Sequence, residues 1–502
     1  MRFYLVFGFL ILGLSDPAFA GWTKTETPNF IVYSEKGKGK TEDFVEELET
    51  FRYYLGKVFR IQPEGDPLRL KIFVLGDASS YRRLTGSSGT AGMFTNSSAG
   101  PVAVLYFAKS GHEFSQDSRQ VLYHEFVHHL QHMGPPVSYP LWYQEGFAEF
   151  ISAFKLTRKS IEFGEILKGR AVGLFERKHR FTAKELLEAT RARKEGGRRI
   201  SGSVFYSQAW LLTHMLFTEP KYQSGLSDFI TLLVSRVHPE KALRHVYDMS
   251  YEELDEAMDR YFEFGKLSRL AFPLAKKGVV PPYKTIKLDS EEGQHIEQFI
   301  SLKFLRDDSK LSDLADDAQA LSAKHGGGPR FLATAVLAKV REENWEAAGK
   351  ITAQAQKQFP ESLDIKFAAA KYSVLHQAYL YEEKFERVEQ PVLAEAIGSL
   401  EQITKADKRN AEAFSLLARA HMLLKTYDFD QVSGYIQTAC ALYPQSREIR
   451  FQFGEFLGQE KRIDEACEAV RPLLHTAHSD EEWEELYNFL KALPGGLEAC
   501  PI

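Results

Sequence analysis

The residues best suited to chemistry in this chain are two histidines and a glutamate within one short segment. His124, Glu125 and His128 form the pattern HExxH inside the stretch VLYHEFVHHLQHM, which covers residues 121–133. Residues four apart lie on the same face of a helix, so both imidazoles can reach one metal ion. Glu125, one residue after the first histidine, can then reach a water molecule beside that ion. The spacing therefore predicts a metal site with a general base.

A catalytic zinc site needs a third protein ligand and one open position. The residue six positions after His128, where metzincins carry a third histidine, is Gly134, which excludes that class. His132 lies a further turn along the same helix, displaced by about 6 Å of rise from His128, and is a poor third ligand. Since the first cysteine is Cys440, any site in the N-terminal part must use nitrogen and oxygen donors.

A second predicted helix supplies carboxylates. It covers residues 140–150, with the sequence PLWYQEGFAEF, and it places Glu145 and Glu149 on one face. Together with HExxH, this segment resembles the gluzincin metallopeptidases, in particular the peptidase MA-like domain, where a W-x-x-E-G-x-A segment follows. The resemblance implies that Glu145 is the third zinc ligand. It also places Glu149, a glutamate where the family has aspartate, as a hydrogen-bond acceptor that orients His124. The alternative for both glutamates is a solvated helix face.

A downstream segment extends the resemblance, which covers about residues 22–265. Residues 205–210 read FYSQAW and resemble the Y-x-Q-x-W stretch of these domains. By this resemblance Tyr206 is the candidate donor of a hydrogen bond to the developing oxyanion, and a core tyrosine is the alternative. His129 and His132 are expected to be surface or packing residues.

The resemblance implies a zinc metallopeptidase with Zn²⁺ as cofactor and a protein or peptide as substrate. The metal would polarise the substrate carbonyl and activate a water molecule. Glu125 would act as the general base and then protonate the leaving amine. Two alternatives stay open: a catalytically inactive peptidase-like adaptor that acts through a protein-binding domain, and hydrolysis of a different amide.

Hydrophobic periodicity predicts the elements that position these residues. Leu122, Phe126 and Leu130 form an apolar line that buries the HExxH helix. A capping box, Ser250-x-x-Glu253, begins a late helix. Strands are expected at 29–34, 68–75, 89–94 and 102–107, and a helix at 40–58. A small sheet followed by helices predicts an α+β metallopeptidase domain over residues 21–270, including the HExxH helix and a helical subdomain.

The remainder of the chain reads as helical. Residues 271–327, which contain several prolines and the run Gly326-Gly327-Gly328, are expected to form a linker with a short helical segment. Residues 328–498 form a predicted all-α helical-repeat domain, in which several segments share a period near 34 residues. They resemble degenerate tetratricopeptide repeats, and such surfaces usually bind proteins. A plain helical bundle is the alternative.

The first twenty residues predict a secretory signal peptide. Arg2 precedes the apolar run 3–14, and residues 17–20 (PAFA) give a small-x-small ending with cleavage before Gly21. An uncleaved membrane anchor is the alternative. No cysteine lies near the cleavage site, so a lipoprotein is not indicated. The mature protein is therefore expected in the periplasm or outside the cell, with no integral membrane span after cleavage.

The net charge limits the classes of partner, and the cysteine content limits the number of disulfides. The formal net charge is -5, so no global basic field points to nucleic acid. The basic run at residues 191–199 is interpreted as a solvated loop. The three cysteines, Cys440, Cys467 and Cys500, allow at most one internal disulfide, and their pairing cannot be chosen from the sequence.

Overall fold

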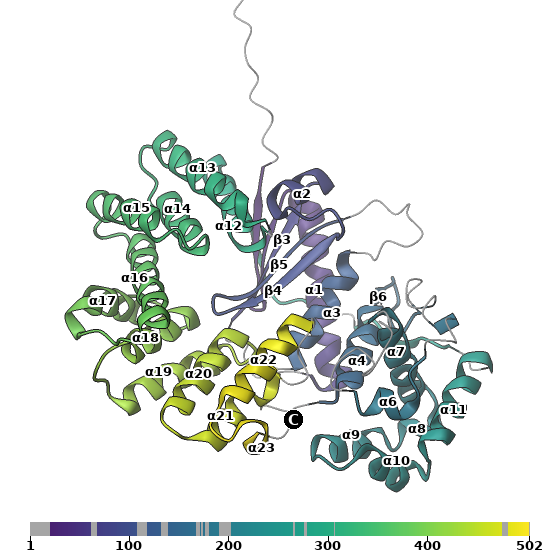
Figure 1. The fold of residues 1–502 in the computed structure, drawn as a ribbon. Coiled ribbons are helices and arrows are strands. Elements are labelled where there is room, and N and C mark those ends of the chain that lie inside the picture. Colours follow the sequence, from purple (N-terminus) through teal and green to yellow (C-terminus); the bar gives the residue numbers. More distant parts are fainter. Residues whose placement is uncertain are drawn as a thin grey trace, which may run out of the picture.

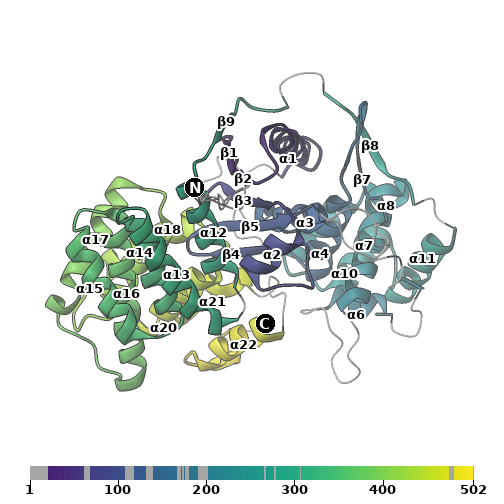
Figure 2. The same ribbon diagram turned by 90° about the horizontal axis from the view of Figure 1, so that it is seen from above.

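The computed structural model of the protein describes residues 21–61, 68–107, 118–131, 139–166, 171, 174–175, 180–189, 202–264, 267–275, 279–305, 307–473 and 480–500. The predicted signal peptide at 1–20, His132, Gly134 and the basic run at 191–199 lie outside these residues. Figures 1 and 2 show a sheet in the middle of the molecule, with the long C-terminal helical part on one side and a smaller helical group on the other.

The central sheet has six strands in the order β4-β5-β3-β2-β1-β9. β3 pairs in parallel with β2 and with β5, whereas the other pairs are antiparallel. Its strands are β1 (Thr23–Glu26), β2 (Phe30–Ser34), β3 (Leu70–Leu75), β4 (Gly92–Ser97), β5 (Gly100–Tyr106) and β9 (Lys284–Lys287). The four expected strands are therefore present as β2, β3, β4 and β5.

Side chains alternate between the two faces of this sheet, as a strand requires. Phe30, Val32 and Ile72 share a core with α1 (Lys38–Phe59) and α3 (Ser118–Gln131). Phe73 and Val104 instead join a core with α2 (Ala78–Thr85) and α12 (Ser290–Phe304). Each face is thus covered by its own helices, and the HExxH residues lie on the side of α1.

The smaller helical group follows α3 in the chain, and it continues the same core. Its helix α11 begins with the predicted capping box, because the Ser250 N–H donates to Glu253 and the Glu253 N–H to Ser250 Oγ. The helices are α4 (Leu141–Ser152), α6 (Ala183–Leu187), α7 (Gly202–Thr218), α8 (Pro220–Gln223), α9 (Leu226–Val234), α10 (Pro239–Tyr247) and α11 (Tyr251–Phe264). A second sheet, in the order β6-β7-β8, comprises β6 (Lys155–Leu156), β7 (Ser160–Phe163) and β8 (Leu270–Pro273).

The interval 271–327 contains more regular structure than a linker. β8 pairs with β7, and β9 pairs with β1, so this segment completes both N-terminal sheets. α12 then covers the central sheet, and α13 (Leu311–Lys324) packs against the next helix, α14. β1 and β9 escape prediction because TKTE and KTIK are short and mostly polar, with little apolar alternation to mark a strand.

The C-terminal part consists of successive helix pairs joined by short connections, which makes neighbouring helices antiparallel. The 34-residue period holds from Pro329 to Leu363, and the long helix α16 then breaks it. The helices are α14 (Pro329–Arg341), α15 (Trp345–Gln358), α16 (Leu363–Lys384), α17 (Gln390–Ala406), α18 (Ala411–Met422), α19 (Phe429–Leu442), α20 (Arg447–Gln459), α21 (Ile463–Val470), α22 (Asp480–Ala492) and α23 (Gly496–Ala499). These pairs form an arc whose last helices return to the N-terminal part (Figure 1).

Two further findings concern the cysteines and the membrane. Cys467 in α21 forms a disulfide with Cys500 just after α23, and Cys440 in α19 is a free thiol. Burial raises the pKa of the Cys440 thiol to about 11. No helix within the described parts of the chain is long and apolar enough to cross a membrane.

Candidate metal centre

Two neighbouring helices bring the predicted metal ligands together. His124 and His128 lie one turn apart on α3, and Glu145 lies on α4, which packs against α3. The two Nε2 atoms are 3.1 Å apart, and Glu145 Oε2 lies 3.2 Å from His124 Nε2 and 3.4 Å from His128 Nε2. Among the described residues, these three form the group of His, Cys, Asp and Glu side chains that could hold one ion.

The spacing of these donors agrees with the geometry that zinc requires. Tetrahedral ligands that are each about 2.0–2.1 Å from an ion lie about 3.3 Å from one another. The three observed separations, 3.1, 3.2 and 3.4 Å, are close to that value. Two nitrogens and one carboxylate oxygen also match the donor set of catalytic zinc sites. The residues therefore fit such an ion.

Burial distinguishes the two interpretations of the α4 glutamates. The side chains of Glu145 and Glu149 are only 2% and 1% exposed. The alternative of a solvated helix face is therefore wrong for both residues. Glu149 Oε1 lies 3.4 Å from His124 Nδ1, the ring nitrogen that faces away from Glu145, which is where a carboxylate that orients the imidazole would lie.

The electrostatic surroundings of His124 favour a positive charge. Burial by itself lowers the pKa of His124, because the imidazolium is desolvated. The hydrogen bond with Glu145 and the charges of Glu149 and Glu125 outweigh that effect, and the pKa is raised above its ordinary value. Three carboxylates around one imidazole thus create a negative potential that a cation would neutralise.

The two predicted catalytic side chains lie beside this group. Glu125 is half-buried on α3, and its charge acts on His124. Tyr206 is half-buried on α7, and its ring contacts that of His124 edge to face, with 6.3 Å between centroids. The structure therefore places Tyr206 next to the candidate metal ligand His124, whereas its neighbours Phe205 and Ser207 are fully buried.

Gly146, the residue after Glu145, fixes how closely α4 approaches α7. A Cβ atom at this position would lie 2.3 Å from the backbone oxygen of Ala209 and 2.3 Å from Thr213 Oγ1, both on α7. Any side chain here would force the two helices apart. The glycine of the W-x-x-E-G-x-A segment therefore sets the distance between the helix of Glu145 and the helix of Tyr206, a role that sequence reasoning did not assign.

The glutamine of the Y-x-Q-x-W segment also has a structural role. The Gln208 side chain accepts a hydrogen bond from the Phe181 N–H at 2.7 Å and donates one to the Phe181 carbonyl at 2.8 Å. This two-point contact holds the chain ahead of α6 against α7, in the interior.

Helices from the far end of the chain contact the HExxH helix. Gln445, between α19 and α20, donates a hydrogen bond to the carbonyl of His129, which lies in the last turn of α3. Tyr443 packs against the His129 ring, 6.4 Å between centroids, and donates to Asn96 on β4. His129 is fully buried, so it is a packing residue, as expected. The involvement of Tyr443 and Gln445 could not be inferred from local sequence.

Comparisons with known proteins give little further information. No family model matches the chain, and no curated protein matches it. Among solved structures, "MamA 41-end from Desulfovibrio magneticus RS-1" matches 38% of this chain and 99% of its own, with 14% sequence identity and a TM-score of 0.28. A likeness at this score carries no argument about fold or function, so the candidate centre rests on its own geometry.

Proposed function

We propose that the protein is an exported zinc-dependent peptidase, with His124, His128 and Glu145 as the metal ligands. The observation that carries this proposal is the convergence of the three donor atoms within 3.1–3.4 Å of one another. Glu125 lies next to this group and is half-buried, so its carboxylate remains accessible to a bound substrate. A purely structural site would have no use for such a base.

The side chains take distinct roles. A zinc ion bound by the three ligands would supply Lewis acidity to the substrate carbonyl and lower the pKa of a water molecule. Glu125 accepts the proton of the attacking water and returns it to the leaving amine. Glu149 Oε1, 3.4 Å from His124 Nδ1, attracts that N–H and holds the imidazole in one orientation. Tyr206, beside His124, donates a hydrogen bond to the oxyanion.

The test is the variant Glu125→Gln in the mature chain, assayed for zinc content and for cleavage of a peptide library. We expect stoichiometric zinc and a loss of hydrolysis of about a hundredfold or more, because the general base is removed while all three ligands remain. Glu145→Gln should instead lose zinc. Glu256→Gln, an exposed change on α11, serves as the matched control.

Two outcomes decide between the alternatives. Normal hydrolysis by Glu125→Gln would exclude the assigned mechanism. Stoichiometric zinc in a wild-type chain that cleaves no peptide would favour the inactive adaptor, which acts through its helical repeats.

A further inference from the structure

A large cleft separates the central sheet from the arc of repeat helices. It encloses about 1210 Å³, which exceeds the roughly 300–1,000 Å³ of ordinary small-molecule sites. Its walls come from β2, β3 and β4 on one side and from α12, α14, α16 and α18 on the other. None of the candidate metal ligands lines it.

The cleft and the metal centre lie on opposite faces of the sheet. Tyr33, Lys71 and Phe73 line the cleft, whereas the alternate residues Val32 and Ile72 belong to the core beneath α1 and α3. Because side chains alternate along each strand, the cleft cannot be the site of His124 and His128. Any ligand of the cleft is therefore bound at a different site from the candidate metal centre.

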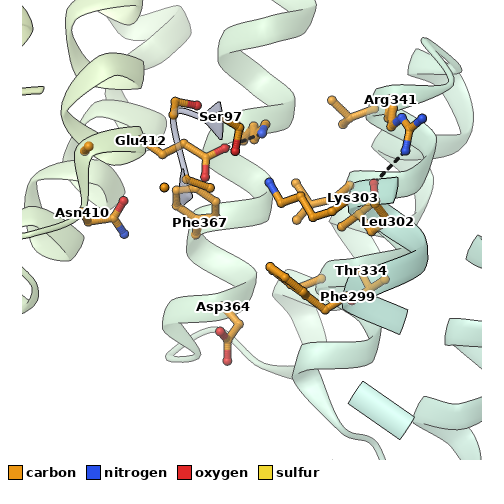
Figure 3. A pocket seen from close by; sticks show the side chains of 18 of the residues that line it. Ser97, Phe299, Leu302, Lys303, Thr334, Arg341, Asp364, Phe367, Asn410 and Glu412 are labelled. Carbon is orange, nitrogen blue, oxygen red and sulfur yellow. Dashed lines mark hydrogen bonds and ion pairs between the residues drawn. The ribbon is translucent and has the colours of Figure 1, made fainter. Parts of the chain in front are cut away.

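Lysines from three different elements converge in this cleft, around one carboxylate. Lys71 is on β3, Lys303 on α12 and Lys371 on α16, and Glu412 is on α18. Lys371 is paired with Glu412. Neither Lys71 nor Lys303 forms an ion pair with any residue that the structure describes, although Lys71 lies over the Phe299 ring at 5.9 Å. Figure 3 shows Lys303 and Glu412 extending toward each other inside the cleft, from two different helices.

The charges of this group act on one another. Burial lowers the pKa of Lys71 and of Lys303, and the charge of Glu412 offsets this only in part. Burial would raise the pKa of Glu412, yet the three lysines hold that pKa below its ordinary value. The charge of Glu412 acts on all three ammonium groups, and the charges of Asp407 and Glu448 act on single members of the group or on pairs. Among the residues that the structure describes, eight Lys and Arg side chains line the cleft against six Asp and Glu, which leaves an excess of positive charge in a partly desolvated place. Such an excess costs stability unless an anion balances it.

The remaining walls indicate what kind of anion fits. Aromatic side chains, Tyr33, Phe73, Phe299 and Phe367, lie beside the lysines, so the cleft offers apolar contacts as well as charge. Acidic residues such as Asp364 and Asp407 also line it, and they would repel a densely charged polyphosphate chain more strongly than a peptide that carries a few carboxylates. A chain that alternates carboxylates with apolar side chains satisfies both the lysines and the aromatic walls.

We propose that this cleft binds an acidic peptide segment of a partner or substrate protein, with a ligand carboxylate between Lys71 and Lys303. The ligand enters between the sheet and the repeats, so both parts of the molecule recognise it. The proposal does not depend on the metal centre, because the two sites lie on opposite faces of the sheet.

The experiment uses the mature chain with the Glu125→Gln change, so that no peptide is cleaved. Fluorescein-labelled peptides in which Asp or Glu alternates with Leu or Phe are titrated by anisotropy, beside the same peptides with Asn and Gln. Lys303→Met should weaken binding of the acidic peptides by about tenfold or more, since one charge-assisted contact is lost. Lys303→Arg should keep most of the affinity. Lys357→Met, exposed on α15 and away from the cleft, is the matched control.

The melting temperature of the variant distinguishes a ligand-binding lysine from one that only stabilises the fold. Without ligand, Lys303→Met should melt at the wild-type temperature or above it, because an unpaired, partly buried charge is removed. If Lys303→Met binds the acidic peptides more weakly but is as stable as the wild type, the proposed binding site is supported. Three results would overturn the proposal. They are equal binding of the acidic and amide peptides, wild-type affinity in Lys303→Met, and binding of inorganic phosphate or an oligonucleotide in place of peptide. Zinc content, measured in parallel, separates this outcome from failure of the proposed peptidase function.

Discussion

Buried carboxylates are the unusual residues of the N-terminal part. Glu145 and Glu149 are almost completely removed from water, yet a charged carboxylate in the interior is costly unless a cation or hydrogen-bond donor compensates it. His124 contacts both carboxylates, one at each ring nitrogen. Two carboxylates on one imidazole leave a negative excess. A divalent ion held by His124, His128 and Glu145 would remove that excess, which is why we interpret the group as a metal centre.

A second buried histidine, His214 on α7, gives a pH-dependent prediction. Burial lowers its pKa to about 4, and hydrogen bonds with Gly164 and Ser268 offset this only in part. Since the folded-state pKa lies below the unfolded value of about 6.5, the unfolded chain binds the proton more readily. Stability is therefore retained above pH 6.5 and lost as the pH falls toward 4, by about 2 kcal/mol at pH 5.

The measurement is urea unfolding at neutral pH and near pH 5, for the wild type and His214→Gln. Other titrating groups contribute equally to both proteins, so the difference between them isolates His214. The wild type should lose about 2 kcal/mol more than the variant on acidification. Equal losses would show that His214 takes up its proton without unfolding.

At the scale of elements, the position of the candidate metal ligands depends on how closely three helices pack. α3 carries two ligands, α4 the third, and α7 brings Tyr206 against His124. The closest approach between α4 and α7 occurs at Gly146, where no Cβ fits. A side chain there would displace the helix that holds Glu145.

Gly146→Ala should therefore destabilise the fold by about 1–3 kcal/mol, the usual cost of overpacking, and should weaken zinc binding. Gly398→Ala is the matched control, because Gly398 is exposed on α17 and a Cβ there has nothing within 4 Å. That change should be neutral or stabilise the helix by up to about 1 kcal/mol. Thermal melting and zinc titration of both variants check this, and similar behaviour of the two would contradict the close-packing role.

The sequence predicts local features of this molecule well and distant contacts poorly. The spacing of His124 and His128 is a property of one helix, and the core strands β2, β3 and β5 carry their own apolar signal. β1 and β9 exist through pairing of segments far apart, as in the hydrogen bond of Thr25 with Thr285, 260 residues away. Hydrophobic periodicity within a short segment cannot predict such pairings.

At the scale of the whole molecule, the most distant contact bears on the HExxH helix itself. The carbonyl of His129 lies in the last turn of α3, and Gln445, 316 residues away, donates a hydrogen bond to it. Tyr443 adds a ring contact with His129 and a hydrogen bond to Asn96. The repeat helices thus contact the last turn of the helix that carries two of the candidate metal ligands.

Removing the hydrogen bond between Gln445 and His129 should weaken zinc binding at the candidate metal centre. Gln445→Ala removes a hydrogen bond to the carbonyl of the buried His129, which should cost about 0.5–1.5 kcal/mol and weaken zinc binding by loosening the last turn of α3. Gln437→Ala, exposed on α19, removes a glutamine of the same repeat without touching α3 and should change neither quantity. Melting temperature and competition with a zinc chelator measure the two effects separately. If Gln445→Ala matches Gln437→Ala in both, the repeats do not brace the HExxH helix. A fall in zinc affinity confined to Gln445→Ala would show that the repeats support the metal centre through the end of α3.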